Sequence, residues 1–383
     1  MDHLDGQRSI CERIKKTFFS CKRLPGISFK GWLMEQTAES KKEFFLTRPV
    51  QFLIHWRPFP PYELICYVLM FAGATMFAWA TMFTDGIHPF SIEIIKPIFL
   101  TIATLYSGFF AALIWNDITD KDIDIIVHPT RAIPSGRISS KKFFAIALVF
   151  SVLTFLFAVL TSPWCLLLVG VTALFVAFHN KYLKKIIKLP AYSEIFTPVQ
   201  WLAVPLFGFF AIFTTLPAPG DINLSVPVLG YLSIHRAQLL PMFLLVLFTY
   251  FADNAHDLAE GIHDVEGDRR LGVKTYATSF GEKNAAKISF CMLFISGILG
   301  ILLWFLTVLS LIFLIPFVIL WFYTLDQSYQ FIKITDDLQR KHMGKIIGKK
   351  GYDYLLFSFS LIFLDVFLQL INAEYLHWIN SIV

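Results

Sequence analysis

Two groups of acidic residues stand where long apolar stretches end. The first, "NDITDKDID", begins at Asn116 and follows the apolar run "FLTIATLYSGFFAALIW". If the helix of that run continues, Asn116, Asp120 and Asp124 share one face at i, i+4 and i+8, and Asp117 and Asp122 point elsewhere. Carboxylate and amide oxygens bind hard cations. Taken alone, however, the group is equally compatible with a solvated loop that ends an apolar helix.

A second acidic group lies in "LLPMFLLVLFTYFADNAHDLAEGIHDVEGDRRLGVKT". Its members, spaced 4, 3, 4 and 4 residues apart, form one helical stripe: Asp253, Asp257, Glu260, Asp264 and Asp268. A carboxylate inside a membrane helix costs up to about 2.5–3.5 kcal/mol, so such charges normally face a polar cavity.

The chain that carries these groups has the composition of a helical membrane protein. Of its 383 residues, 56% are hydrophobic and 16% are charged, which leaves too little polar surface for a soluble fold. Apolar blocks alternate with short charged blocks and predict an all-α, polytopic protein with nine transmembrane helices. The predicted spans are roughly residues 63–83, 97–115, 143–161, 164–178, 195–215, 239–257, 288–307, 310–325 and 354–370.

The positive charges predict an orientation for these spans. Of the 33 Lys and Arg residues, 31 fall in the amino-terminal segment and in the second, fourth, sixth and eighth connections; the others are Lys96 and Arg236. The positive-inside rule then places the amino terminus in the cytoplasm and the carboxyl terminus on the opposite side. Both acidic groups lie at cytoplasmic ends of their spans, where they can face each other.

Two facing acidic stripes repel each other unless a cation lies between them. Oxygen ligands suit Mg²⁺, which also binds substrate phosphates. Basic residues follow both stripes: Arg131, Arg137, Arg269, Arg270 and Lys274. Carboxylates alone fit a cation transporter, whereas carboxylates with adjoining basic groups better fit a site for Mg²⁺ and a diphosphate.

Several motifs resemble those of the UbiA-type polyprenyltransferase superfamily. "NDITDKDID" is similar to the NDxxDxxxD motif of these enzymes, and "DVEGD" is similar to their DxxxD motif. "HPTRAIPSGRIS" resembles their R-P-x-P-S-G-x-I-S element, and "WRPFPP" resembles their Arg-Pro sequence before the first span. The resemblance covers nearly the whole chain from about Arg57.

This resemblance implies a barrel of nine membrane helices around a central cavity that is capped on the cytoplasmic side and opens laterally to lipid. It implies transfer of a prenyl group from an allylic diphosphate to an aromatic, quinone-precursor or other small or lipid acceptor. Mg²⁺ is the implied cofactor, and the implied partners are the prenyl diphosphate, the acceptor and membrane lipid. No nucleic-acid partner is predicted.

The resemblance also implies roles for individual residues. The metal-binding residues would be Asn116, Asp120, Asp124, Asp257, Asp264 and Asp268, with Asp120 and Asp264 as the catalytic pair. The resemblance implies Arg131, Arg137 and Lys184 as contacts to the diphosphate, and Lys274, a basic residue that follows the second stripe, and Glu194 complete the predicted substrate-binding residues.

The sequence departs from the family pattern at three positions. These departures bear on the identity of the acceptor more than on the ionisation of the diphosphate. Ala132 replaces the usual proline, and His179 in "FHNKYLKK" stands where the family has tyrosine. Glu194 is an unusual acid at the start of the fifth span. It is positioned either to accept a proton from an acceptor or to pair with Lys184 or Lys188.

Two other functions are compatible with the acidic groups. A terpene cyclase of the same superfamily uses the same ionisation but captures the cation with its own alkene. A cation-coupled transporter is expected to show repeated halves and helices broken at the midplane, and neither feature is recognisable in the sequence. The sequence does not indicate the acceptor, the prenyl chain length, the oligomeric state or which membrane holds the protein.

The chain is predicted to comprise a cytoplasmic amino-terminal segment, residues 1–58, and a transmembrane domain, residues 59–383. Within the first, "ICERIKKTFFSCKRL" mixes basic and apolar residues as membrane-surface segments do, although a basic tail without fixed structure is equally compatible. The five cysteines form no CxxC motif or Cys/His cluster, so no metal or disulfide role is predicted for them.

Overall fold

The protein is described from a computed structural model that covers residues 56, 59–82, 92–121, 124–125, 130–216 and 220–382. Residues from Phe59 onward form a compact unit of their own. Asp122 and almost all of the amino-terminal segment, with Cys11 and Cys21, lie outside the described residues. The surface-associated role of residues 1–58 therefore stays a prediction.

Nine helices in the described part of the chain are long and apolar enough to cross a membrane. This finding confirms the prediction of an all-α, multi-pass membrane protein. These spans are built on α4 (Pro61–Ala80), α5 (Ile95–Thr119), α7 (Ser140–Thr161), α8 (Pro163–Phe178), α11 (Val199–Thr215), α12 (Arg236–Leu271), α14 (Glu282–Leu306), α15 (Leu311–Lys333) and α16 (Asp337–Ile382). The spans of α5, α8 and α11 also include the short elements next to these helices, at residues 92–94, 179–183 and 192–196.

Two helices are much longer than their predicted spans. The sixth span is predicted to end at residue 257, but α12 continues to Leu271, and α16 begins at Asp337 where a charged connection is predicted. Hydropathy detects only the part of a helix inside the bilayer, whereas Glu, Lys, Gln and Arg favour helix outside it as well. Gly272 ends α12 with a left-handed φ of 69°, and the Val273 N–H donates to the Asp268 carbonyl at 2.9 Å.

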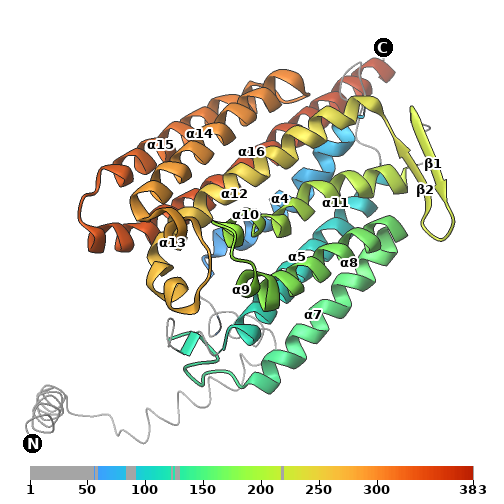
Figure 1. The fold of residues 1–383 in the computed structure, drawn as a ribbon. Helices are drawn as coiled ribbons and strands as arrows, with labels where there is room; N and C mark the ends of the chain where they lie inside the picture. Colours follow the sequence, from blue (N-terminus) through green and yellow to red (C-terminus); the bar gives the residue numbers. More distant parts are fainter. Residues whose placement is uncertain are drawn as a thin grey trace, which may run out of the picture. The chain divides into compact units, whose positions relative to one another are not determined.

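The nine helices pack in chain order into a closed ring. Each contacts the next along the sequence, and α16 returns to pack against α4. Further contacts join helices that are not consecutive, and the most extensive of them are α4 with α11 and α12 with α16. Figure 1 shows α12 and α16 side by side along much of their length. The first and last helices therefore close the ring, and α16 supports the helix that carries the second acidic group.

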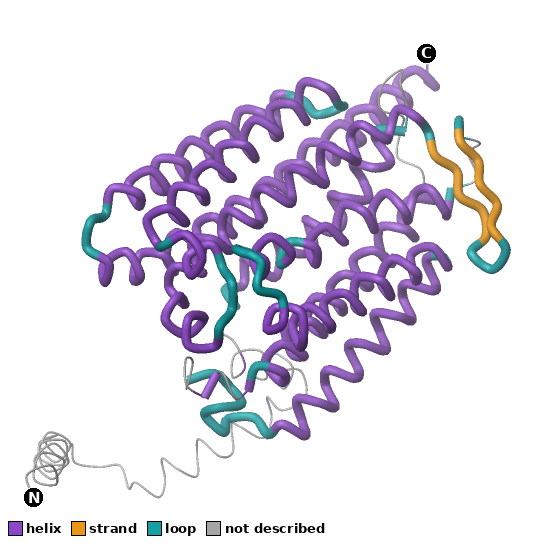
Figure 2. The backbone as a smooth tube through the Cα atoms, in the orientation of Figure 1, coloured by secondary structure: helices purple, strands orange, loops and turns teal. Residues whose placement is uncertain are grey.

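Short elements gather at one end of this ring. They are the π-helical turn η2 (His179–Leu183), α9 (Lys184–Ile186), α10 (Tyr192–Phe196) and α13 (Tyr276–Phe280), whereas the 3₁₀ turn η1 (Ile92–Ile94) precedes α5 at the end of that helix opposite to Asp120. Figure 2 shows the loops before α10 and after α12 close together at this end. An antiparallel hairpin, β1 (Ile222–Val226) and β2 (Gly230–Ile234), lies at the other end (Figure 1). Only a connection is predicted there, because a short isolated hairpin has no strong sequence pattern.

Candidate active site

The first acidic group continues the helical turn at the end of α5. The Asp120 N–H donates to the Asn116 carbonyl at 2.9 Å, and the Asp124 N–H donates to the Asp120 carbonyl at 2.8 Å. These i to i+4 bonds place the three side chains along one helical face. Asp124 is buried, and Asn116 and Asp120 are partly buried.

Two cationic side chains contact this group. Arg131 Nη1 lies 2.7 Å from Asp124 Oδ1 and 4.0 Å from Asp117 Oδ1. Lys184 Nζ lies 3.3 Å from Asp120 Oδ2, and the two side chains are only 15% and 13% exposed. Lys184 directly follows the π-helical turn η2, a type of helix irregularity that is frequent at functional sites.

Lys184 also connects the first acidic group with the second. Asp264 and Asp268 lie one turn apart on α12 and interact electrostatically. Lys184 is close enough to Asp268 for these two charges to interact as well. One lysine therefore lies among carboxylates from α5 and from α12, although no local pattern in the sequence joins the three segments.

Arg137 and Lys274 contact other parts of the backbone. The exposed Arg137 guanidinium donates to the Thr130 carbonyl at 2.5 Å and to Ser135 Oγ at 3.0 Å. The Lys274 carbonyl accepts a hydrogen bond from the Ser193 N–H at 3.0 Å. Their roles as substrate contacts stay predictions.

Glu194 is buried and joins α10 to two other elements. Its Oε2 accepts a hydrogen bond from the Tyr276 N–H at 2.5 Å, at the start of α13. Asn254 of α12 donates to the Glu194 carbonyl at 3.3 Å. Of the two lysines named as alternative partners of Glu194, Lys184 contacts Asp120 and Lys188 donates to the Gly272 carbonyl.

Tyr276 is the other ionisable group at this junction. Burial, helped by the nearby Tyr250 and Glu194, raises the pKa of its phenol to about 12. Its phenol is therefore neutral near pH 7, which makes Tyr276 a poor proton acceptor at this junction.

Two polar residues at the site are not among the predicted ones. Asp117 is buried beside Arg131. His256 lies between two aspartates of α12, with its Nε2 2.7 Å from Asp253 Oδ1 and its Nδ1 3.4 Å from Asp257 Oδ1. The sequence could have indicated His256, because this histidine lies in an apolar helix with one aspartate three residues before it and another directly after it.

Aromatic rings from four helices form a cluster next to His256. Ring centroids are 4.5 Å apart for Tyr67 and Phe109, 5.6 Å for Phe109 and Trp201, and 5.8 Å for Trp201 and Tyr352. The Tyr67 and Tyr352 hydroxyls are 2.8 Å apart, and the Tyr352 ring is 5.0 Å from the His256 ring. Apolar rings thus border the acidic stripe of α12.

The acidic residues fit a metal that completes its coordination with other ligands. Among the described residues, no three His, Cys, Asp or Glu side chains converge closely enough to hold an ion by themselves. Mg²⁺ needs only one or two carboxylates, because waters and substrate phosphates supply the rest. The Oδ2 atoms of Asp253 and Asp257 are buried and accept no hydrogen bond within the described structure. Such carboxylate oxygens suit a divalent cation.

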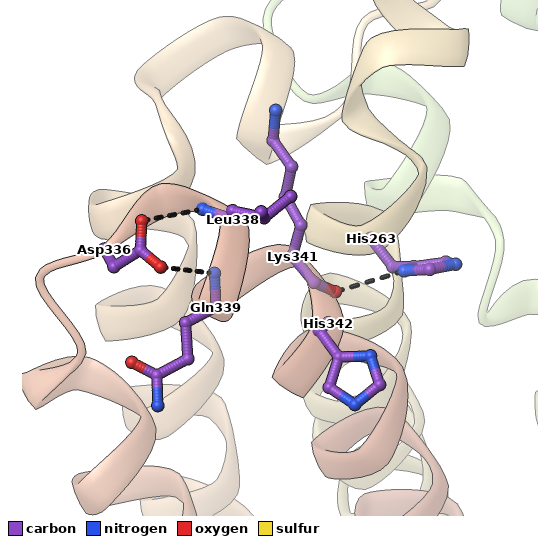
Figure 3. A pocket seen from close by; sticks show the side chains of 6 residues that line it. All are labelled: His263, Asp336, Leu338, Gln339, Lys341 and His342. Carbon is purple, nitrogen blue, oxygen red and sulfur yellow. Dashed lines mark hydrogen bonds between the residues drawn. The ribbon is translucent and has the colours of Figure 1, made fainter.

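An open pocket of about 540 Å³ lies on a different face of α12. Figure 3 shows its lining residues, which are His263, Asp336, Leu338, Gln339, Lys341 and His342. His263 Nδ1 is 3.1 Å from the Lys341 carbonyl, and Asp336 accepts from the Leu338 and Gln339 N–H groups at the start of α16. The pocket is a junction of helix ends and contains none of the predicted site residues.

The chain matches the UbiA prenyltransferase family over residues 67–346, a range that contains both acidic groups, Arg131, Lys184 and Glu194. The chain belongs to this family. It is therefore a prenyltransferase enzyme, as its motifs predict.

Three relatives of this UbiA prenyltransferase act on different substrates. A digeranylgeranylglyceryl phosphate synthase of Saccharolobus solfataricus is 29% identical over 230 residues, which cover 58% of this chain and 73% of the relative. A 4-hydroxybenzoate octaprenyltransferase of a Janthinobacterium species is 30% identical over 49% of this chain and 58% of its own length. A 2-acylphloroglucinol 4-prenyltransferase of Humulus lupulus is 25% identical over 74% of this chain and 65% of its own length.

Solved structures share the fold of this UbiA prenyltransferase. A UbiA homolog from Aeropyrum pernix is 18% identical with a TM-score of 0.54, covering 77% of this chain and 98% of that one. A structure of digeranylgeranylglyceryl phosphate synthase in membranes is 18% identical with a TM-score of 0.50, covering 80% and 99%. A homolog from Archaeoglobus fulgidus, 14% identical with a TM-score of 0.46 over 79% and 96%, was solved bound to GPP and Mg²⁺, which are ligands of that protein.

Proposed function

We propose that this UbiA prenyltransferase uses Mg²⁺ to transfer a prenyl group from an allylic prenyl diphosphate to an acceptor within the membrane. The observation that carries the proposal is the position of Lys184, which pairs with Asp120 of α5 and lies near Asp268 of α12. An ammonium group held among carboxylates of two helices is well placed to bind diphosphate oxygens, which the carboxylates alone would repel.

The predicted ligands remain the residues we assign to the metal. Asn116, Asp120 and Asp124 of the first acidic group and Asp264 and Asp268 of the second, extended by Asp257, would hold two Mg²⁺ ions and the diphosphate between them. The unpartnered Oδ2 of Asp257 and the shared helical face of the α5 residues support this assignment. When bound, Mg²⁺ neutralises charge that develops on the departing diphosphate.

The other residues of the site stabilise both products of the ionisation. Lys184 and Arg131 hold the diphosphate through charge-assisted hydrogen bonds. The aromatic cluster of Tyr67, Phe109, Trp201 and Tyr352 offers ring faces to the allylic cation, each worth roughly 0.5–2 kcal/mol. The same rings exclude water, which would otherwise capture the cation.

The relatives support two classes of acceptor. Their names specify a glyceryl phosphate product in one case and phenolic acceptors in the others. We propose that the acceptor belongs to one of these classes and that the cation is passed to it. Capture by the substrate's own alkene, as in a cyclase, remains the alternative to be tested.

The test is a product assay with purified enzyme in lipid nanodiscs. Prenyl diphosphates of several lengths are supplied with Mg²⁺ and either a prenylated glycerol phosphate, a phenolic acid or an acylphloroglucinol. We expect a prenylated acceptor with Mg²⁺, none with EDTA, and recovery when Mg²⁺ is restored. Asp120→Asn and Asp264→Asn should each lower turnover at least about 100-fold, because each removes charge from a metal ligand.

Glu266→Gln is the matched control. Glu266 lies on α12 two residues after Asp264, but its exposed carboxylate pairs with Lys341 at 2.8 Å, so turnover should stay near that of the wild type. Transfer that persists in EDTA would rule out the metal site. Rapid formation of a cyclic hydrocarbon or terpene alcohol from the diphosphate alone would replace the transferase assignment with that of a cyclase.

A further inference from the structure

We propose that His256 is a positioning residue that holds the carboxylate of Asp257 in place for the divalent cation. This inference rests on the proposed function, since it assumes that α12 binds the metal. It adds a residue that the acidic motifs do not include and assigns α16 a part in building the site.

The geometry of α12 gives the first argument. The imidazole lies between two carboxylates, 2.7 Å from Asp253 and 3.4 Å from Asp257. Asp253 is completely buried, and His256 is 7% exposed. One nitrogen is therefore tied to a carboxylate that cannot move into solvent, and the other faces the carboxylate assigned to the metal. The ring couples the position of Asp257 to the fixed interior of the protein.

The packing of α16 gives the second argument. A Cβ added at Gly351 would lie 2.8 Å from the His256 Cβ, and one added at Gly348 would lie 3.2 Å from the His256 carbonyl oxygen. Any larger residue would force the two helices apart at this point. The Tyr352 ring lies 5.0 Å from the imidazole and is held by Tyr67 through a 2.8 Å contact between the two hydroxyls. The imidazole is thus confined by α16 as well as by its two aspartates.

The chemistry of metal sites gives the third argument. A carboxylate that binds a metal through one oxygen is usually oriented by a hydrogen-bonding partner at the other, and loss of that partner weakens metal binding about 10- to 100-fold. Asp257 has the elements of this arrangement: its Oδ1 lies 3.4 Å from His256 Nδ1, an ion-pair contact and not a hydrogen bond in this structure, while its Oδ2 is buried and accepts no hydrogen bond within the described structure. A merely structural histidine would instead affect stability without changing the affinity for a metal.

The experiment measures metal binding independently of turnover. Mn²⁺ is titrated into the purified enzyme with inorganic pyrophosphate, and free Mn²⁺ is followed by electron paramagnetic resonance. His256→Phe should weaken Mn²⁺ binding about 10- to 100-fold and raise the Mg²⁺ concentration for half-maximal turnover by a similar factor. His256→Gln, whose amide can still donate, should recover part of the loss.

His263→Phe is the matched control. His263 lies two turns further along α12 and contacts the Lys341 carbonyl of α16, so its replacement tests general disturbance of the same helix pair. We expect Mn²⁺ binding of this variant to equal that of the wild type.

The outcomes separate this inference from the proposed function. If the wild type binds no Mn²⁺, the proposed metal site is wrong. If the wild type binds Mn²⁺ and folded His256→Phe binds it equally well, only the role of His256 is wrong. If His256→Phe does not fold, Asp253→Asn and His256→Gln decide the question, because both substitutions keep the side-chain volume. Unchanged Mn²⁺ binding in both variants overturns the inference. Weaker Mn²⁺ binding in Asp253→Asn supports it.

Discussion

Lys184 supplies a positive charge beside the acidic residues at the ends of α5 and α12, and it belongs to neither of these helices. It comes from the connection between α8 and α10, directly after the π-helical turn, and reaches Asp120 on α5 and the neighbourhood of Asp268 on α12. A largely buried ammonium is stabilised by these carboxylates, and its remaining donors can serve a phosphate oxygen. We propose that the residue balances the acids before a substrate binds and contacts the diphosphate afterwards.

Replacement of Lys184 tests this assignment at the level of one side chain. Lys184→Met should lower kcat/KM for the prenyl diphosphate about 100-fold or more, because loss of one donor to a developing anion typically costs about 100- to 1,000-fold. Lys188→Met, which removes a lysine of the same connection whose ammonium donates to the Gly272 carbonyl at 3.4 Å, should stay close to the wild type. Steady-state kinetics at saturating Mg²⁺ provide the measurement, and equal rates for the two variants would contradict the assignment.

At the level of elements, α10 fixes the end of α12. Glu194 joins the start of α13 through Tyr276 and contacts α12 through Asn254. Gly261 of α12 leaves room for the Glu194 carboxylate, since an added Cβ would overlap its Oε1. The short helices α10 and α13 therefore help to hold in position the region of α12 that carries Asp264 and Asp268.

Two substitutions at Glu194 distinguish this structural role from a role in proton transfer. Glu194→Ala should destabilise the protein by about 1–3 kcal/mol, because the buried Tyr276 N–H loses its acceptor. Glu194→Gln keeps an acceptor oxygen and should retain most of both stability and turnover. Thermal unfolding in detergent and product formation are measured on both variants. Loss of turnover in Glu194→Gln at unchanged stability would show instead that Glu194 acts as the base.

At the level of the whole molecule, the distribution of charge predicts an orientation in the membrane. The amino-terminal segment and the connections after α5, α8, α12 and α15, together with the helix ends that flank these connections, carry 31 of the 33 Lys and Arg residues, whereas the β1–β2 hairpin lies at the other end of the helices. We propose that the active site faces the cytoplasm and that the hairpin lies on the opposite side.

Single cysteines in a version without the native cysteines test this orientation. Ser140→Cys at the start of α7 and Lys283→Cys at the start of α14 are exposed positions on the proposed cytoplasmic side, and Ser225→Cys in β1 is exposed on the other. In intact cells or sealed vesicles of the same orientation, an impermeant thiol reagent should label only Ser225→Cys. Lysis should make the other two reactive. Labelling of either cytoplasmic position before lysis would contradict the proposed orientation.

The sequence by itself determined the membrane helices, their charge asymmetry and the two acidic groups. These features are local: hydropathy is read over about 20 residues, and the spacing of Asn116, Asp120 and Asp124 fixes a common face within one helix. The stripe from Asp253 to Asp268 indicated helix beyond the hydrophobic part of the sixth span, although hydropathy did not, and the hairpin was not determined because short exposed strands leave only a weak pattern.

Only the tertiary structure decided which groups meet. The pairing of Lys184 with Asp120 spans 64 residues, and that of Glu194 with the Tyr276 N–H spans 82. Such contacts depend on the order in which the helices close the ring and on how the loops turn, neither of which a local sequence pattern specifies. The confinement of His256 likewise depends on the close approach of α16 at Gly351, which is set by packing between helices from distant parts of the chain.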